Sequence, residues 1–278
     1  MSENKNIILV HAMSRAGQHP IIDWVYNQFN DDRLFLNYMF INDPNFLERR
    51  SQYYFNNKKY YYILNPNWKK YGVLEEKLRE FNPETSDIFN RISLSKKNLL
   101  MMNFENVNLT DSKENIDKFE AQFVSNGSYT NVLIVRDIFN YLASKIKMGR
   151  YFHPEKNIEN WKSHAKEYLK KTCCLNNKIT INFNKWVTDP DYRKLKSVEL
   201  KCDIFLPEWR QISSFGGGSS FDFLSFQGKG NEMAVFERWK EYRNNREFRK
   251  FLEDEELWEL SESIFGHIQG TEELHNGI

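Results

Sequence analysis

Residues 6–29 read NIILVHAMSRAGQHPIIDWVYNQF and contain the signals that decide the fold. A short apolar run from Asn6 to His11 predicts a buried parallel strand, because it is followed at once by a turn of small residues. The helical pattern that follows, from about Pro20 to Phe29, places large apolar side chains on one face. A strand, a tight loop and a helix in this order predict an α/β protein.

The rest of the chain continues this alternation. Further strands are predicted at residues 34–40, 60–64, 99–104, 132–135 and 179–183. Helices are predicted at residues 73–81, 114–123, 139–148, 158–170, 232–242 and 254–265. The pattern predicts one α/β domain over residues 1–278, with a central parallel β-sheet flanked by helices on both faces. Ligands of such sheets bind at the carboxyl ends of the strands.

The charge of the chain is nearly balanced. Its 278 residues contain 39 Lys and Arg against 38 Asp and Glu, a formal net charge of +1. This balance argues against a surface that collects nucleic acid through bulk charge. Cys173, Cys174 and Cys202 match neither a disulfide framework nor a zinc motif. No apolar run approaches the ~20 residues of a membrane span. We therefore predict a cytoplasmic protein with no nucleic-acid partner and no membrane insertion, and the oligomeric state stays open.

The loop from Ser14 to Pro20 is a candidate anion site. A strand that stops, a glycine that allows a tight turn and a helix with free amide groups together bind anions. Arg15 adds a positive charge, and Gln18 and His19 each carry a side-chain donor. The loop lacks the G-x-x-x-x-G-K-[ST] pattern, which disfavours ATP hydrolysis. An ordinary connection with a surface Arg and His is the alternative.

A second candidate site follows the strand predicted at residues 132–135. Arg136 lies at the carboxyl end of this strand, where ligands bind. Ser144 follows eight residues later, about two helical turns away, so a long Arg side chain could share one phosphate with its hydroxyl. An Arg136–Asp137 pair that caps the start of the helix is the alternative.

With these two features the chain resembles the P-loop sulfotransferase superfamily. Its members carry a basic residue, a glycine and hydroxyl residues after the first strand, and later an Arg followed eight residues on by a Ser. The resemblance implies a P-loop NTPase-like three-layer sandwich and 3′-phosphoadenosine 5′-phosphosulfate (PAPS) as cosubstrate. Arg15 would take the part of the basic residue that bridges the phosphosulfate and steadies the departing phosphate. Ala16, Gly17, Gln18 and His19 would form the rest of the cofactor loop, although Ala16 lacks the usual hydroxyl and bulky side chains replace two small ones.

The same resemblance extends to the second site and to a third segment. It implies that Arg136 and Ser144 bind the 3′-phosphate. Residues 226–230 read FQGKG, similar to a basic loop that closes over the nucleotide, so Lys229 and Gly230 would contact the cofactor. An exposed Lys in a turn is the alternative for Lys229. The glycine-rich and serine-rich stretch at residues 213–220 is either a functional lid or an inert linker.

Transfer of a sulfuryl group to a hydroxyl or amine needs a general base. Glu105, after the strand predicted at 99–104, is the candidate that the resemblance favours, and His11, at the end of the first strand, is its rival. A loop carboxylate that faces water and a hydrogen-bonded core histidine are the respective alternatives. No metal is expected, because cations and helix dipoles can stabilise the developing charge.

The acceptor is predicted to be a small molecule or a glycan. The aromatic segments 53–55 and 60–62 could line its pocket or pack as strands in the core. Two other functions stay open: a divergent P-loop kinase, which would need magnesium, and a non-catalytic module that binds a nucleotide or a partner.

Overall fold

The computed structural model describes residues 6–29, 33–39, 51–55, 58–62, 99–124, 129–149, 153–210, 212 and 218–275. The helix predicted at residues 73–81 lies outside these ranges, as does most of the stretch 213–220.

The described strands form one sheet in the order β4-β3-β2-β5-β1-β6-β7. They are β1 (Asn6–Ala12), β2 (Arg33–Met39), β3 (Ser51–Phe55), β4 (Lys58–Tyr62), β5 (Leu99–Glu105), β6 (Tyr129–Val135) and β7 (Lys178–Asn182). Five neighbouring strands, β2, β5, β1, β6 and β7, pair in parallel, as predicted. At the other edge, the predicted parallel sheet is extended by β3 and β4, which pair antiparallel; β3 was not predicted. The aromatic segments 53–55 and 60–62 form these two strands, and their side chains lie outside the described part of the chain.

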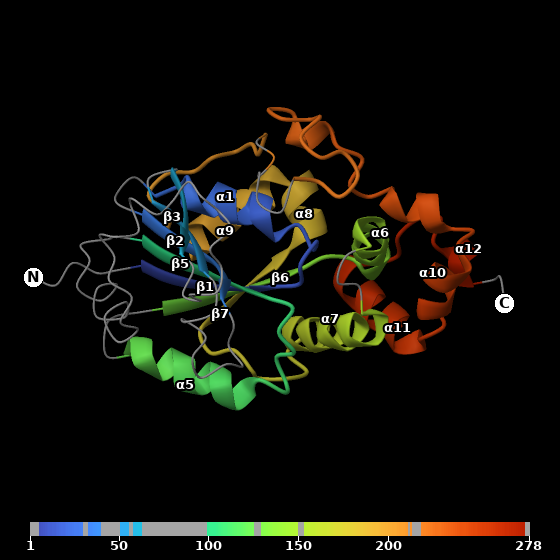
Figure 1. Cartoon of the computed structure of the whole chain (residues 1–278), viewed down its shortest axis with the longest axis horizontal. Coiled ribbons are helices and arrows are strands. Elements are labelled where there is room, and N and C mark those ends of the chain that lie inside the picture. Colours follow the sequence, from blue (N-terminus) through green and yellow to red (C-terminus); the bar gives the residue numbers. More distant parts are fainter. Residues whose placement is uncertain are drawn as a thin grey trace, which may run out of the picture.

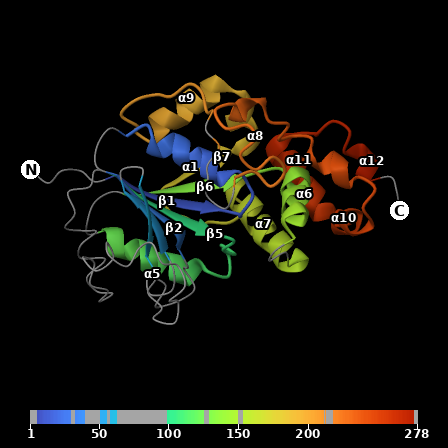
Figure 2. The same cartoon turned by 45° about the horizontal axis from the view of Figure 1, so that its top comes forward.

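Helices cover both faces of the sheet, as predicted. They are α1 (Gln18–Tyr26), α5 (Lys113–Val124), α6 (Ile138–Met148), α7 (Pro154–Tyr168), α8 (Phe183–Thr188), α9 (Pro190–Glu199), α10 (Arg246–Phe251), α11 (Glu255–Phe265) and α12 (Glu272–His275), with the 3-10 helices η2 (Gly230–Glu232) and η3 (Arg238–Tyr242). In Figures 1 and 2, α1, α8 and α9 lie on one side of the sheet and α5 and α7 on the other. Helices α10, α11 and α12 gather beyond the carboxyl ends of the strands.

The α-helix predicted at residues 232–242 is wrong. Two short 3-10 helices, η2 and η3, stand there instead, separated by the extended Met233 and a turn in which the amide of Glu237 donates to the carbonyl of Ala234 at 3.3 Å. The carbonyl oxygens of Val235 and Phe236 accept hydrogen bonds from the side chains of Arg136 and Asn140. Because these carbonyls are bound by the neighbouring structure, they are not used in a helical ladder.

The central strand β1 is buried on both faces, as its apolar run predicts. Ile7 and Leu9 belong to the core under α5, α6 and α7, whereas Ile8 and Val10 belong to the core under α1 and α8. The end of the strand, Ala12, pairs with Glu105 on one side and with Ile134 on the other. The loop after β1 therefore lies between the ends of β5 and β6, where the other predicted site residues follow.

Candidate anion-binding site

The loop after β1 turns sharply into α1. The amide of Ala16 donates to the carbonyl of Met13 at 3.0 Å, and both Arg15 and Gly17 have positive φ, 73° and 81°. Gly17 precedes α1 and lies against the ring of Phe183, so closely that a Cβ atom there would come within 2.1 Å of the ring. A glycine is required for this backbone conformation and this approach. It also leaves the first amide groups of α1 without a capping side chain, which is the arrangement of helix N-termini that bind anions.

The loop is anchored to the segment after β5. The amide and the hydroxyl of Ser14 both donate to Asn106 Oδ1, each at 3.0 Å. Asn106 itself has a positive φ of 59°, its amide donates to Ala12, and its carbonyl accepts from Asn160 of α7 at 2.7 Å. These bonds hold the loop in place from the side of β5.

Glu105 lies beneath the loop as a buried carboxylate. Its Oε1 accepts hydrogen bonds from Gln18 Nε2 at 3.0 Å and Asn103 Nδ2 at 3.1 Å, and His19 Nε2 lies 3.3 Å away. Burial raises the pKa of Glu105, but the hydrogen bond and charge of His19, with the bonds from Gln18 and Asn103, outweigh it and hold the pKa below its usual value. Gln18 and His19 were predicted to donate hydrogen bonds to a phosphate. In the structure the Nε2 atoms of both side chains point toward Glu105.

Arg136 is buried and turns toward the loop. Its Nη1 donates to the carbonyl of Arg15 at 3.3 Å and to Ser144 Oγ at 3.4 Å, and its Nη2 donates to Val235 O at 2.5 Å. The guanidinium also stacks over Phe183, 5.0 Å from the ring centre. The spacing of eight residues does bring Arg136 and Ser144 together.

The alternative for this segment was an Arg136–Asp137 pair that caps the helix, and only Asp137 takes this part. Asp137 caps α6, accepting from the amide of Asn140 at 2.8 Å. Arg136 does not join this cap, since its described hydrogen bonds run to the loop, to Ser144 and to Val235.

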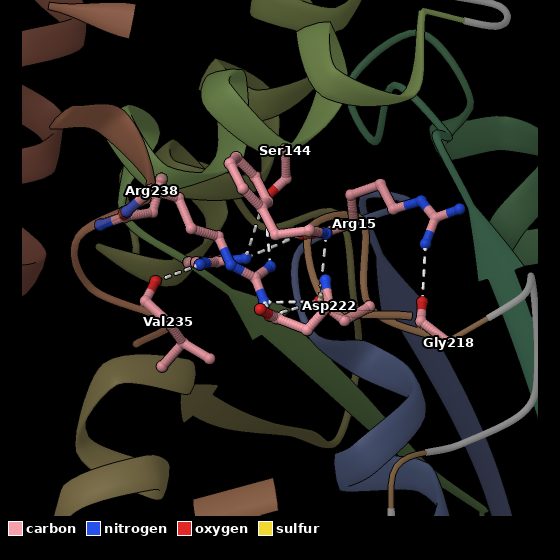
Figure 3. Close-up of polar contacts among 10 residues, drawn as sticks. Arg15, Ser144, Gly218, Asp222, Val235 and Arg238 are labelled. Carbon is pink, nitrogen blue, oxygen red and sulfur yellow. Dashed lines mark hydrogen bonds and ion pairs between the residues drawn. The ribbon is translucent and has the colours of Figure 1, made fainter. Parts of the chain in front are cut away.

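A second arginine reaches the same hydroxyl. Arg238 Nη1 donates to Ser144 Oγ at 3.3 Å, and Nη2 donates to Ser219 Oγ at 2.9 Å and lies 3.5 Å from Asp222 Oδ2 (Figure 3). Burial, and then the charge of Arg238, lower the pKa of Arg136 to about 9. Burial likewise lowers the pKa of Arg238 to about 10, with Asp222 opposing and Arg15 adding to the shift.

Two more cations lie at this loop: Arg15 belongs to it, and Lys145 reaches it from α6. Arg15 Nη1 donates to the carbonyl of Gly218 at 3.0 Å, and Lys145 Nζ donates to Ser14 Oγ at 3.0 Å (Figure 3 draws the former). Burial lowers the pKa of Lys145 to about 8, with Glu105 opposing and Arg15 adding to the shift. A mutually repelling group of partly desolvated cations is a place where an anion is stabilised.

His11, the rival base, lies in the core. It is 1% exposed, its Nε2 is 2.9 Å from Asn131 Oδ1, and its ring stacks on Phe104. Burial lowers the pKa of His11 to about 3, so the ring is neutral at neutral pH. This placement favours the alternative interpretation, a hydrogen-bonded core histidine.

The segment with Lys229 and Gly230 packs differently from the other predicted contacts. Gly230 is buried against Trp209, and its amide donates to the carbonyl of Arg210 at 2.9 Å. The side chain of Lys229 is exposed. Among the described residues, no side-chain hydrogen bond or ion pair joins Lys229 to Arg136 or Ser144.

Sequence reasoning missed Arg238, Lys145, Asp222 and Asn106. Lys145 directly follows Ser144, and this adjacency was a usable signal. Arg238 was assigned to a predicted α-helix, whereas it follows a turn and its amide donates to Asn140 on the helix that carries Ser144.

The chain has no significant match to any protein-family model or to any curated protein sequence. Its fold is similar to the solved sulfotransferase domain of the olefin synthase of Synechococcus PCC 7002, with a TM-score of 0.55 and 11% sequence identity over 95% of each chain. At this identity the comparison shows a shared α/β fold.

Neither a metal site nor a membrane-spanning helix is found among the described residues. No three or more His, Cys, Asp and Glu side chains in these ranges gather as a metal site requires. No helix there combines the length and the apolar character needed to cross a lipid bilayer.

Proposed function

We propose that this protein is a sulfotransferase that moves a sulfuryl group from PAPS to a hydroxyl or amine of a small molecule or glycan. The observation that carries the proposal is the contact between the two predicted anion sites. Arg136 Nη1 donates both to the loop carbonyl of Arg15 and to Ser144 Oγ. The fold shared with a sulfotransferase domain supports the same reaction class.

The residues of the site fit a nucleotide with phosphates at both ends. Arg136 Nε is buried and has no hydrogen-bond partner among the described residues, a donor that an anion could use. Arg136 and Ser144 would bind the 3′-phosphate. Arg15 and the amide groups at the start of α1 would bind the 5′ end, where negative charge grows on the departing phosphate.

The reaction forms a bond between the acceptor oxygen or nitrogen and sulfur, and breaks the bond between sulfur and the bridging phosphate oxygen. The proton of the acceptor needs a base. Glu105 carries a negative charge at neutral pH because its pKa is depressed, and it lies next to the loop. We assign it the role of accepting this proton, and Gln18 and His19 the role of orienting it.

The first test of the proposal is the recognition of the 3′-phosphate. In calorimetry, 3′-phosphoadenosine 5′-phosphate is expected to bind the protein more tightly than AMP. Arg136→Ala is expected to weaken its binding by roughly 10- to 100-fold, as the loss of charge-assisted hydrogen bonds implies. Binding of AMP serves as the internal control for folding and should weaken far less, because AMP lacks the 3′-phosphate. Equal affinity of the unaltered protein for the two nucleotides would contradict the proposal.

The second test uses Lys145. Because its pKa is lowered to about 8, the side chain loses its proton as the pH rises from 7 to 9. A bound anion favours the charged form, so nucleotide affinity should fall over this range, by about tenfold at most. Lys145→Arg keeps its charge and should reduce the decline in calorimetry at pH 7, 8 and 9, leaving only the smaller loss near pH 9 expected from Arg136, whose pKa is about 9. An equal decline in both proteins would show that another group titrates.

A further inference from the structure

Arg238 is delivered to Ser144 by a separate segment of the chain. It lies at the start of η3, 94 residues after Ser144 in sequence, and its side chain is 9% exposed. Its amide donates to Asn140 Oδ1 of α6 at 2.9 Å. The backbone and the side chain are thus both fixed on the helix that carries Ser144.

Arg238 and Arg136 form a pair of like charges around one hydroxyl. Their Nη1 atoms lie 3.3 and 3.4 Å from Ser144 Oγ, and both guanidinium groups are almost entirely removed from water. Each such group is costly to bury without an anion. A phosphate monoester, with about two negative charges and several acceptor oxygens, satisfies both at once.

Asp222 forms an ion pair with Arg238. Its Oδ2 lies 3.5 Å from Arg238 Nη2 and accepts from Ser219 Oγ at 3.0 Å. The amide of Asp222 in turn donates to Ser219 Oγ, and the ring of Phe221 lies under the guanidinium at 5.0 Å. A tight turn over residues 219–222 therefore closes on Arg238, with the carboxylate of Asp222 beside the guanidinium group (Figure 3).

We propose that Arg238, and not Lys229, is the second cation for the 3′-phosphate, and that Asp222 competes with this phosphate for Arg238. The inference rests on the proposed function and specifies its nucleotide site. When the phosphate binds, its oxygens replace the carboxylate of Asp222 and the turn over residues 219–222 moves away from Arg238. Asp222 thereby sets how tightly nucleotides with a 3′-phosphate bind, whereas nucleotides without one are unaffected.

Three variants test this inference by calorimetry with 3′-phosphoadenosine 5′-phosphate and with AMP. Arg238→Gln is expected to lower the affinity for the 3′-phosphorylated nucleotide at least tenfold and to change that for AMP less than twofold. Asp222→Asn removes the competitor and is expected to raise the first affinity severalfold, again without an effect on AMP. Lys229→Gln tests the alternative that Lys229 binds the 3′-phosphate, and it is expected to change neither affinity more than twofold.

The results separate this inference from the proposed function. If the unaltered protein prefers the 3′-phosphorylated nucleotide but only Lys229→Gln weakens it, the assignment of Arg238 is overturned. If Asp222→Asn weakens that binding, competition by Asp222 is overturned. This variant keeps the test decisive should Arg238→Gln fail to fold. If the unaltered protein does not prefer the 3′-phosphorylated nucleotide, the proposed function itself fails.

Discussion

Gly17→Ala is expected to lower the free energy of unfolding by about 2–4 kcal/mol. The substitution places a side chain on a residue whose backbone is in the left-handed conformation, and the added methyl group crowds the core. The backbone at Gly17 has a φ of 81°, and an added Cβ would lie 2.1 Å from the ring of Phe183. Phe183 is buried and supports the guanidinium of Arg136, so its displacement should also weaken nucleotide binding. Denaturant unfolding measures the first effect and calorimetry the second.

Gly228→Ala is the matched control. Gly228 has the same φ of 81°, but an added Cβ there would meet nothing within 4 Å. Only the backbone penalty of about 1–2 kcal/mol is expected, with no loss of nucleotide affinity. If the two variants lose equal stability, the close contact of Gly17 with Phe183 is not a determinant of the loop.

Glu105→Gln is expected to reduce turnover by about 10²- to 10⁴-fold, the usual contribution of a general base. The amide cannot accept the proton of the acceptor, and it replaces a carboxylate oxygen that faces Gln18, Asn103 and His19. The measurement is transfer to a hydroxyl or amine acceptor, together with the affinity for the nucleotide, which should change far less than turnover.

Glu120→Gln is the control for the loss of a buried carboxylate. Glu120 is 2% exposed and accepts from Tyr129, Asn131 and Asn176, on the face of the sheet that carries α5. This variant should be destabilised but retain turnover. Equal loss of turnover in both variants would remove Glu105 from the mechanism.

The lowered pKa of Glu105 also predicts that the folded protein loses stability as the pH falls. Its pKa in the folded protein is lower than in the unfolded chain, so its stabilisation is present above the unfolded value and is lost as the pH falls through the folded one. Stability should therefore decline less steeply toward acid pH in Glu105→Gln than in the unaltered protein.

The amino-acid sequence alone determined the parts of this protein that depend on local patterns. The apolar run and small-residue turn of residues 6–20 predicted β1, the loop and the start of α1, because burial on both faces and a tight turn leave marks in consecutive residues. The spacing from Arg136 to Ser144 predicted their contact, because the helix between them has a regular rise.

Only the tertiary structure decided the parts that depend on distant segments. The edge pair β3 and β4 runs antiparallel, a direction that no local pattern of aromatic residues encodes. Gln18 and His19 turn toward Glu105, which lies 87 residues beyond Gln18. Arg238 reaches Ser144 because the chain before it does not form an α-helix. The carbonyls of Val235 and Phe236 accept hydrogen bonds from the side chains of Arg136 and Asn140 instead. Contacts between residues far apart in the chain are set by how the layers pack, and such packing has no signature in any short stretch of sequence.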